Sequence, residues 1–251
     1  MLELPPLHVE RRPVSVAARI LESGPVALLT TSDRGTANVM PLVWHMPISS
    51  HPALVAVAIE QSRHTAEMVS HSEQFALNIP NRTLLHHVQY LGSMSGKNID
   101  KFEATQLETF FAAHLTAPLI RDCIAWIECE VQHVLPFGDH FLYIGLVVAV
   151  HVDPTAFDEH WLLEDPDARP LHLLGANLYA ALDTPLEARM PRGSDAPERV
   201  LAERVQEELE LTHEAQERHA ELVDEALRDL QAGNVVDLSA LMRRPGDGGV
   251  R

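Results

Sequence analysis

The sequence predicts a mainly β protein in which an antiparallel sheet closes into a barrel and is followed by a C-terminal α-helical extension. Short apolar or alternating runs outnumber helical segments up to about residue 153, without the regular strand and helix alternation of a parallel sheet. Beyond residue 190 the chain becomes charge-rich, with apolar residues spaced as on one helix face. A chain of 251 residues, 46% of them hydrophobic, is long enough to bury a core.

Six runs have the strand pattern, because their apolar residues either alternate or fill consecutive positions. The predicted strands are residues 26–31, 36–44, 54–59, 75–79, 123–134 and 141–152. Asp33-Arg34-Gly35 is expected to form the hairpin turn between the first two. Helices are expected at 14–23, 65–71, 82–91 and within 99–114, a loop at 46–52, and an extended arm at 1–13.

The C-terminal region is predicted to be a separate unit, which divides the chain into a barrel domain over residues 1–190 and a tail over 191–251. Residues 191–197 contain two prolines, a glycine, a serine and an aspartate, as linkers do. Residues 198–232 form an amphipathic pattern through Leu201, Val205, Leu209, Leu222, Ala226 and Leu230. Such a narrow apolar stripe predicts packing on the barrel or on another subunit. An alternative is an interaction module that resembles the helical arm of bacterial antitoxins.

The charge balance excludes some partners. Lys and Arg total 19 against 36 Asp and Glu, a formal net charge of -17. An acidic surface repels phosphate backbones and anionic lipids, so neither nucleic-acid nor membrane binding is expected. An anionic ligand would need a local basic pocket.

The two cysteines, Cys123 and Cys129, are expected to be buried free thiols on one face of a strand, too far apart to bond to each other. This usage is typical of a reducing compartment. The N-terminal residues have no signal-peptide pattern, and no run reaches the length of a membrane span. The sequence therefore predicts a cytoplasmic protein.

Several enzyme motifs are absent from the sequence. Residues 92–98 fail as a P-loop, because the glycines are too close and an asparagine replaces the hydroxyl that holds magnesium. They also fail as a nucleophile elbow, and no G-x-G-x-x-G follows a predicted strand. The 15 histidines have poor spacing for shared ligation, so no metal site is predicted.

One segment has the composition of a phosphate site. Gln61-Ser62-Arg63-His64-Thr65 places a cation and two hydroxyls at the predicted start of a helix. Free N–H groups and the helix dipole favour an anion there, and arginine adds a charged donor. The same residues also fit a helix N-cap beside a solvated arginine, which on spacing alone is the commoner case. Lys101, next to Phe102, offers a second cation.

An ordered set of short motifs resembles the flavin reductase-like, FMN-binding split-barrel family that includes flavoredoxin. The motifs are Asn38, Trp44, Ser62-Arg63-His64-Thr65, residues 75–80, Gly92 with Ser95-Gly96, residues 100–103, and Gly138-Asp139-His140 with Gly145. Together they cover roughly residues 14–182. The resemblance implies an antiparallel barrel, a homodimer, one FMN per subunit, and hydride transfer from a nicotinamide to the flavin. The region after residue 190 has no counterpart in the family pattern.

The resemblance also implies roles for particular residues. Ser62, Arg63 and Thr65 would contact the phosphate and ribityl chain, and Lys101 and Phe102 would close over phosphate and ring. Asn38 would hold the 45–50 loop or the flavin edge, and Asn78 would lie near the flavin. His140 would border the nicotinamide side as the candidate catalytic residue. The remaining cofactor-binding candidates are Trp44, His45, Met46, Pro47, Ser49 and Ser50.

The predicted function is therefore an oxidoreductase that binds FMN and transfers hydride to the flavin from NADH or NADPH. In such an enzyme the flavin carries the redox chemistry, so no nucleophile or acid–base pair need appear in the sequence. The alternative is a flavin-binding electron carrier or sensor that does not use a nicotinamide and docks a protein partner through its helical tail.

Overall fold

The computed structural model describes residue 13, residues 16–21 and 24–186, and the single residues His213 and Arg228. Apart from those last two positions, the predicted linker and amphipathic tail lie outside the described residues, as does most of the predicted N-terminal arm. The helix expected over 14–23 is found as α1, Ala17–Leu21. None of the helices in the described part of the chain is long and apolar enough to cross a membrane.

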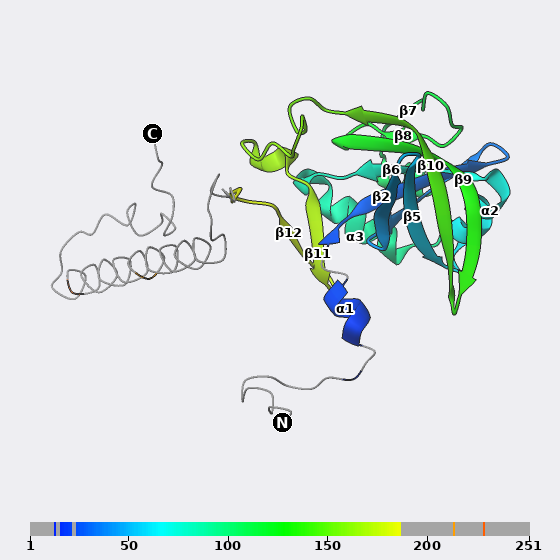
Figure 1. The fold of residues 1–251 in the computed structure, drawn as a ribbon, viewed down its shortest axis with the longest axis horizontal. Helices are drawn as coiled ribbons and strands as arrows, with labels where there is room; N and C mark the ends of the chain where they lie inside the picture. The colour runs from blue at the N-terminus through cyan, green and yellow to red at the C-terminus, as the bar shows by residue number, and fades with distance from the viewer. Residues whose placement is uncertain (1–12, 14–15, 22–23, 187–212, 214–227, 229–251) are drawn as a thin grey trace, which may run out of the picture. The chain divides into compact units, whose positions relative to one another are not determined.

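Within the described residues, seven strands form one antiparallel sheet, in the order β3-β2-β6-β9-β10-β5-β4 (Figure 1). In that order the strands are Thr36–Leu42, Ala27–Asp33, Gln74–Ile79, Ala125–Phe137, His140–Val152, Ala53–Glu60 and His45–Ser50. Each of the six predicted strands lies in this sheet. β9 and β10 form a long hairpin, clearly visible in Figure 1.

Two smaller sheets and several short helices complete the described part of the chain. β1 (Gly24–Pro25), β11 (Leu171–Gly175) and β12 (Leu178–Ala181) form one sheet, and β7 (Thr109–Phe110) pairs with β8 (Leu119–Ile120). The helices are α2 (His64–Ser72), α3 (Leu85–Ser93) and α4 (Lys101–Thr105), with single 3₁₀ turns η2 (Arg82–Leu84) and η3 (Pro166–Ala168).

The turn between β2 and β3 follows the prediction. Asp33 pairs with Thr36 across the hairpin, so Arg34 and Gly35 form a two-residue loop. Both have positive φ, 51° and 82°, as the loop that matches strand twist requires. Glycine adopts this conformation without strain.

The sheet is covered on both faces, which explains the long fully buried runs in β2 and β6. One core cluster includes Leu29, Val57, Phe75 and Tyr143, and the other includes Leu28, Val88, Leu91 and Trp126. Gly145 in β10 permits close packing in the first cluster, because a Cβ there would come within 2.7 Å of the Phe75 ring.

Three local predictions were wrong. Residues 46–52 are not a loop, because 45–50 pair with β5 as the edge strand β4. Residues 99–114 are helical only in α4, and 109–110 pair with β8 instead. Cys123 precedes β9 and belongs to the second core cluster, whereas Cys129 belongs to the first, so the two buried thiols do not share a strand face.

Candidate functional site

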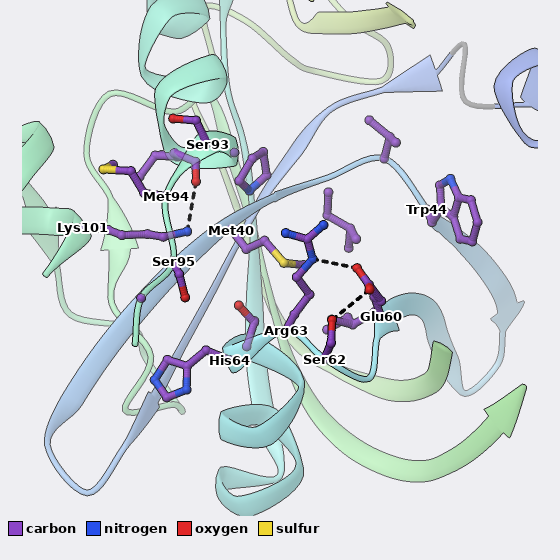
Figure 2. A pocket seen from close by; sticks show the side chains of 18 of the residues that line it. Met40, Trp44, Glu60, Ser62, Arg63, His64, Ser93, Met94, Ser95 and Lys101 are labelled. Carbon is purple, nitrogen blue, oxygen red and sulfur yellow. Dashed lines mark hydrogen bonds and ion pairs between the residues drawn. The ribbon is translucent and has the colours of Figure 1, made fainter. Parts of the chain in front are cut away.

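A cavity of about 710 Å³ lies where β3, the end of β5, the start of α2 and the segment after α3 meet (Figure 2). This volume falls in the range of small-molecule and cofactor sites, roughly 300–1,000 Å³. Its lining residues are Met40, Pro41, Leu42, Val43, Trp44, Ala58, Ile59, Glu60, Ser62, Arg63, His64, Thr65, Leu91, Gly92, Ser93, Met94, Ser95, Gly96, Lys101 and His140.

The start of α2 forms one wall of this cavity. Arg63 occupies the N-cap position with an extended backbone, and among the described residues no side chain caps the helix. The first N–H groups of the helix thus have no side-chain acceptor, and the dipole places partial positive charge at the same point. Thr65, Ala66, Met68 and Val69 are buried and hold the helix on the sheet. This wall is suited to an anionic group.

A carboxylate pairs with the two residues that precede this helix. Glu60, the last residue of β5, accepts a hydrogen bond from Ser62 Oγ at 2.8 Å and one from Arg63 Nε at 2.9 Å. Figure 2 shows both contacts converging on the Glu60 side chain. The Ser62 hydrogen bond, followed by the charge of Arg63, lowers the pKa of Glu60. Glu60 is therefore ionised at neutral pH.

Lys101 is a buried cation on the opposite side of the cavity. Its side chain is 4% exposed, and Nζ donates to the backbone carbonyls of Val39 and Leu91, each at 3.0 Å. Burial, with a smaller contribution from the charge of Arg63, lowers the pKa of Lys101 to about 8. An ammonium has three N–H groups, so two carbonyls leave one for a ligand.

Asn38 supports the site from behind. It is buried in β3, and its Nδ2 donates to Thr65 Oγ1 at 2.9 Å. The Thr65 hydroxyl is thereby used as an acceptor, which leaves its proton available for donation towards the cavity. A Cβ at Gly96 would overlap Asn38 Oδ1, so glycine is required for this close approach of the segment after α3.

Two aromatic rings form another wall. Trp44 and His140 stack with ring centroids 4.7 Å apart and an interplanar angle of 23°. His140 Nδ1 lies 2.6 Å from Asp139 Oδ1, which fixes the ring orientation. The register of the sheet pairs His140 with Glu60. Gln61 strengthens this link, because its backbone N–H donates to Asp139 O at 2.9 Å and its Nε2 donates to Gly138 O at 3.2 Å.

His64 is the first residue of α2 and also lines the cavity. Its Nδ1 is buried and makes no hydrogen bond within the described part of the chain, although Glu67 Oε2 lies 3.5 Å away. Lys97 Nζ lies 3.7 Å from the same carboxylate oxygen. His64 thus connects the cavity to a polar cluster with Glu67 and Lys97.

The structure brings part of the predicted set together at this cavity. Trp44, Ser62, Arg63, Thr65, Lys101 and His140 all line it, although they come from four different parts of the chain. The other predicted residues do not line it: Asn38, His45, Met46, Pro47, Ser49, Ser50, Asn78 and Phe102.

Physical reasons account for these departures. Asn78 is fully buried in the core, where its amide donates to Leu28 O and Thr30 Oγ1 and its oxygen accepts from the Ile120 N–H. Phe102 packs against the second core cluster. Both side chains are therefore used by the fold itself.

Residues 45–50 do not line the cavity because they form the edge strand β4 and not a loop. His45 Nε2 lies 3.0 Å from Pro25 O, and burial lowers its pKa, an effect that this hydrogen bond opposes. His45 and Met46 line a separate apolar pocket of about 500 Å³, which shares Val43, Trp44 and Ala58 with the main cavity. Pro47, Ser49 and Ser50 continue along the edge strand.

Sequence reasoning missed several lining residues, including Met40, Glu60, Ser93 and Met94. Glu60 could have been considered, because it directly follows the strand predicted over 54–59 and stands three residues before Arg63. Nothing in the sequence marks Met40 and Met94 as cavity residues, since an apolar residue in or next to a strand or helix is ordinarily part of the core.

Residues 21–173 match the flavin reductase like domain family, and the chain belongs to that family. Among similar proteins, the uncharacterized protein YddH of Escherichia coli (strain K12) is 30% identical over 168 residues, which are 65% of this chain and 89% of that protein. An NADH:FMN oxidoreductase of Rhodococcus erythropolis is 26% identical over 148 residues, 58% of this chain and 68% of that protein.

Solved structures agree with this assignment. The FMN-binding protein from Thermus thermophilus with bound p-hydroxybenzaldehyde matches with a TM-score of 0.60 and 27% identity, over 66% of this chain and 90% of that one. Flavoredoxin from Methanosarcina acetivorans matches with a TM-score of 0.61 and 26% identity, over 68% and 90%. The described fold is thus a flavin reductase-like, FMN-binding split barrel, as the sequence predicted.

The cavity has features that fit FMN. A phosphate with a charge of about −1.5 to −2 suits the uncapped start of α2 between Arg63 and Lys101. A planar ring suits the wall that contains Trp44 and His140. Glu60 is the carboxylate among the described lining residues, and its charge opposes an anion beside Arg63.

Proposed function

We propose that this chain binds FMN in the main cavity and catalyses hydride transfer from NADH or NADPH to the flavin. The observation that carries the proposal is the cavity itself, which joins the cationic start of α2 to the stacked Trp44 and His140 rings. Membership of the flavin reductase like domain family supports it, as does the similarity to an NADH:FMN oxidoreductase.

In this proposal the cationic end holds the phosphate. The first N–H groups of α2, the Ser62 and Thr65 hydroxyls and the Arg63 guanidinium would donate to its oxygens. Arginine suits this role because its planar fork can make two parallel hydrogen bonds. Lys101 would approach from the opposite wall, where its position is fixed by two backbone carbonyls.

The aromatic end would align and shield the reacting rings. Trp44 and His140 would exclude water from one side, and Asp139 would keep the His140 ring in a fixed orientation. FMN, when bound, supplies the redox chemistry by accepting the hydride. The chain's own residues bind the cofactor, orient it and hold His140 next to the space where a nicotinamide would enter.

An anaerobic titration tests the proposal. Protein loaded with FMN is mixed with NADH or with NADPH, and the visible absorbance of the flavin is followed. We expect bleaching at a rate that depends on nicotinamide concentration, and the preferred nucleotide is the one with the higher kcat/KM. Protein that binds no FMN, or FMN that neither nucleotide reduces, would overturn the proposal.

The similarity to flavoredoxin favours a second candidate, a flavin-binding electron carrier. The same titration separates the two functions. A carrier would bind FMN but would be reduced only by a protein donor or by dithionite, and not by either nicotinamide.

We further propose that the protein is a homodimer. β4 is the last strand of the sheet, and its Met46 and Ile48 side chains are 55% and 42% exposed. Trp44 and Val43, which line the main cavity, also line the apolar pocket beside this strand. Unpaired edge strands with apolar side chains commonly pair with another chain. Light scattering of the full chain would test this, and a monomer at micromolar concentration would contradict it.

A further inference from the structure

The Glu60 carboxylate is bound to two side chains that could also bind an anion in the cavity. Its two oxygens accept from Ser62 Oγ at 2.8 Å and from Arg63 Nε at 2.9 Å. Glu60, Ser62 and Arg63 all line the main cavity, and Figure 2 shows the two contacts side by side. These are two of the donors that a phosphate at the start of α2 would use.

The balance of charged side chains in the cavity determines how strongly Glu60 affects a bound anion. Among the described lining residues, the arginine is Arg63, the lysine is Lys101 and the carboxylate is Glu60. Lys101 already donates to two backbone carbonyls. Glu60 therefore offsets the charge of the more accessible cation, whose side chain is 58% exposed.

Glu60 cannot easily leave this position. It is the last residue of β5, and its backbone is paired in register with His140 of β10. The contacts of its side chain, in contrast, are weakly held, because exposed ion pairs contribute little to stability. The backbone thus keeps the carboxylate at the cavity, while Arg63 and Ser62 can exchange it for another anion.

We propose that Glu60 is a built-in competitor for the phosphate of FMN, and that it lowers the affinity for phosphorylated flavin without affecting recognition of the ring. This inference rests on the proposed function, since it concerns the same site. The competition acts at the phosphate end, so riboflavin, which lacks that group, should be insensitive to Glu60.

Glu60→Gln tests the inference, because glutamine keeps the shape and removes the charge. Dissociation constants of FMN and of riboflavin are measured by fluorescence titration in low-salt buffer for the wild type and the variant. Glu108→Gln is the matched control, since Glu108 forms an exposed pair with Arg121 Nε at 3.2 Å and does not line the cavity.

We expect Glu60→Gln to tighten FMN binding by roughly five- to ten-fold, as removal of one like charge a few ångströms from a dianion predicts. Riboflavin binding should change less than about two-fold. The gain for FMN should shrink as salt is added, and Glu108→Gln should change neither flavin.

Two results would overturn the inference while leaving the proposed function intact. Weaker FMN binding by Glu60→Gln would mean that Glu60 orients Arg63 towards the phosphate. Equal changes for FMN and riboflavin, or no change, would mean that Glu60 does not compete with the phosphate. Wild-type protein that binds neither flavin would instead contradict the proposed function itself.

Discussion

Glu60 and Glu128 are two carboxylates of the same sheet with opposite surroundings. Glu128 in β9 is fully buried and accepts from the Ala113 and His114 backbone N–H groups and from His151 Nε2, each at 2.8 Å. The Glu60 side chain is 40% exposed, and its partners within the described residues are the Ser62 and Arg63 side chains. Backbone donors are fixed by the fold, whereas side-chain donors can rotate to another acceptor.

The two carboxylates reach the same protonation state by different routes. Burial alone would raise the pKa of Glu128, but the two backbone hydrogen bonds and His151 together lower it. The pKa of Glu60 is lowered by the Ser62 hydrogen bond and then by Arg63, with little burial to oppose them. Both are ionised at neutral pH, yet only Glu60 has partners that a ligand could take over. Glu128 therefore serves the structure, whereas Glu60 lines the cavity with partners that can exchange.

The largest expected effect is on stability at Glu128. Glu128→Ala should lower the free energy of unfolding by about 3 kcal/mol, because it leaves two backbone N–H groups and His151 without their acceptor. Urea unfolding measures this loss. Glu108→Ala, which breaks an exposed pair, should cost less than about 1 kcal/mol. Equal losses for the two variants would remove the distinction between fixed and exchangeable partners.

Lys101 sharpens the comparison, because it is buried like Glu128 but lines the cavity like Glu60. Its pKa is lowered to about 8 in the folded state by burial and by Arg63, against 10.5 ordinarily. Between these values the unfolded chain binds more protons, so this group makes the free energy of unfolding rise with pH. From about pH 7.5 to about pH 10, stability of the wild type relative to Lys101→Met should therefore increase by about 2 kcal/mol.

Lys97→Met is the control for this pH dependence. The Lys97 side chain is 55% exposed beside Glu67, so its variant should follow the wild-type curve in parallel. Parallel curves for Lys101→Met as well would show that Lys101 has an ordinary pKa.

A smaller effect is expected at Arg63. Arg63→Gln should weaken FMN binding about ten-fold, the loss of a charge-assisted contact, and should leave riboflavin within about two-fold. Arg121→Gln, which disrupts the pair with Glu108 outside the cavity, should change neither dissociation constant. If Arg63→Gln leaves FMN binding unchanged, Arg63 is a solvated residue and the phosphate lies elsewhere.

Two asparagines show how far sequence reasoning reached. Asn38 and Asn78 were both expected near the flavin, and both are buried in strands. Asn38 donates to Thr65 Oγ1 behind the cavity wall. The Asn78 amide instead donates to Leu28 O in β2 and accepts from the Ile120 N–H. Side-chain direction depends on sheet register and on which loop packs over each face, and neither is encoded in residue type.

The strands were predictable for a different reason. The mostly apolar composition of a run such as 75–79 is by itself enough to predict a buried strand. The edge strand β4 was not predictable, because Pro47, Ser49 and Ser50 are typical of a loop and pairing with β5 overrides that preference. Glu60 was missed because its role arises from a turn that brings Arg63 back towards the end of β5.

The hydrogen bonds between Gln61 and the tip of the β9–β10 hairpin have a practical consequence for redesign. Lengthening the hairpin at Gly138 would leave His140 paired with Glu60 in the sheet but would displace the Gly138 and Asp139 carbonyls to which Gln61 donates. Any loop graft at that tip should therefore alter both ends of the cavity together. Ser93, Met94 and Ser95 line the cavity without that link, so they are the better positions for substitutions.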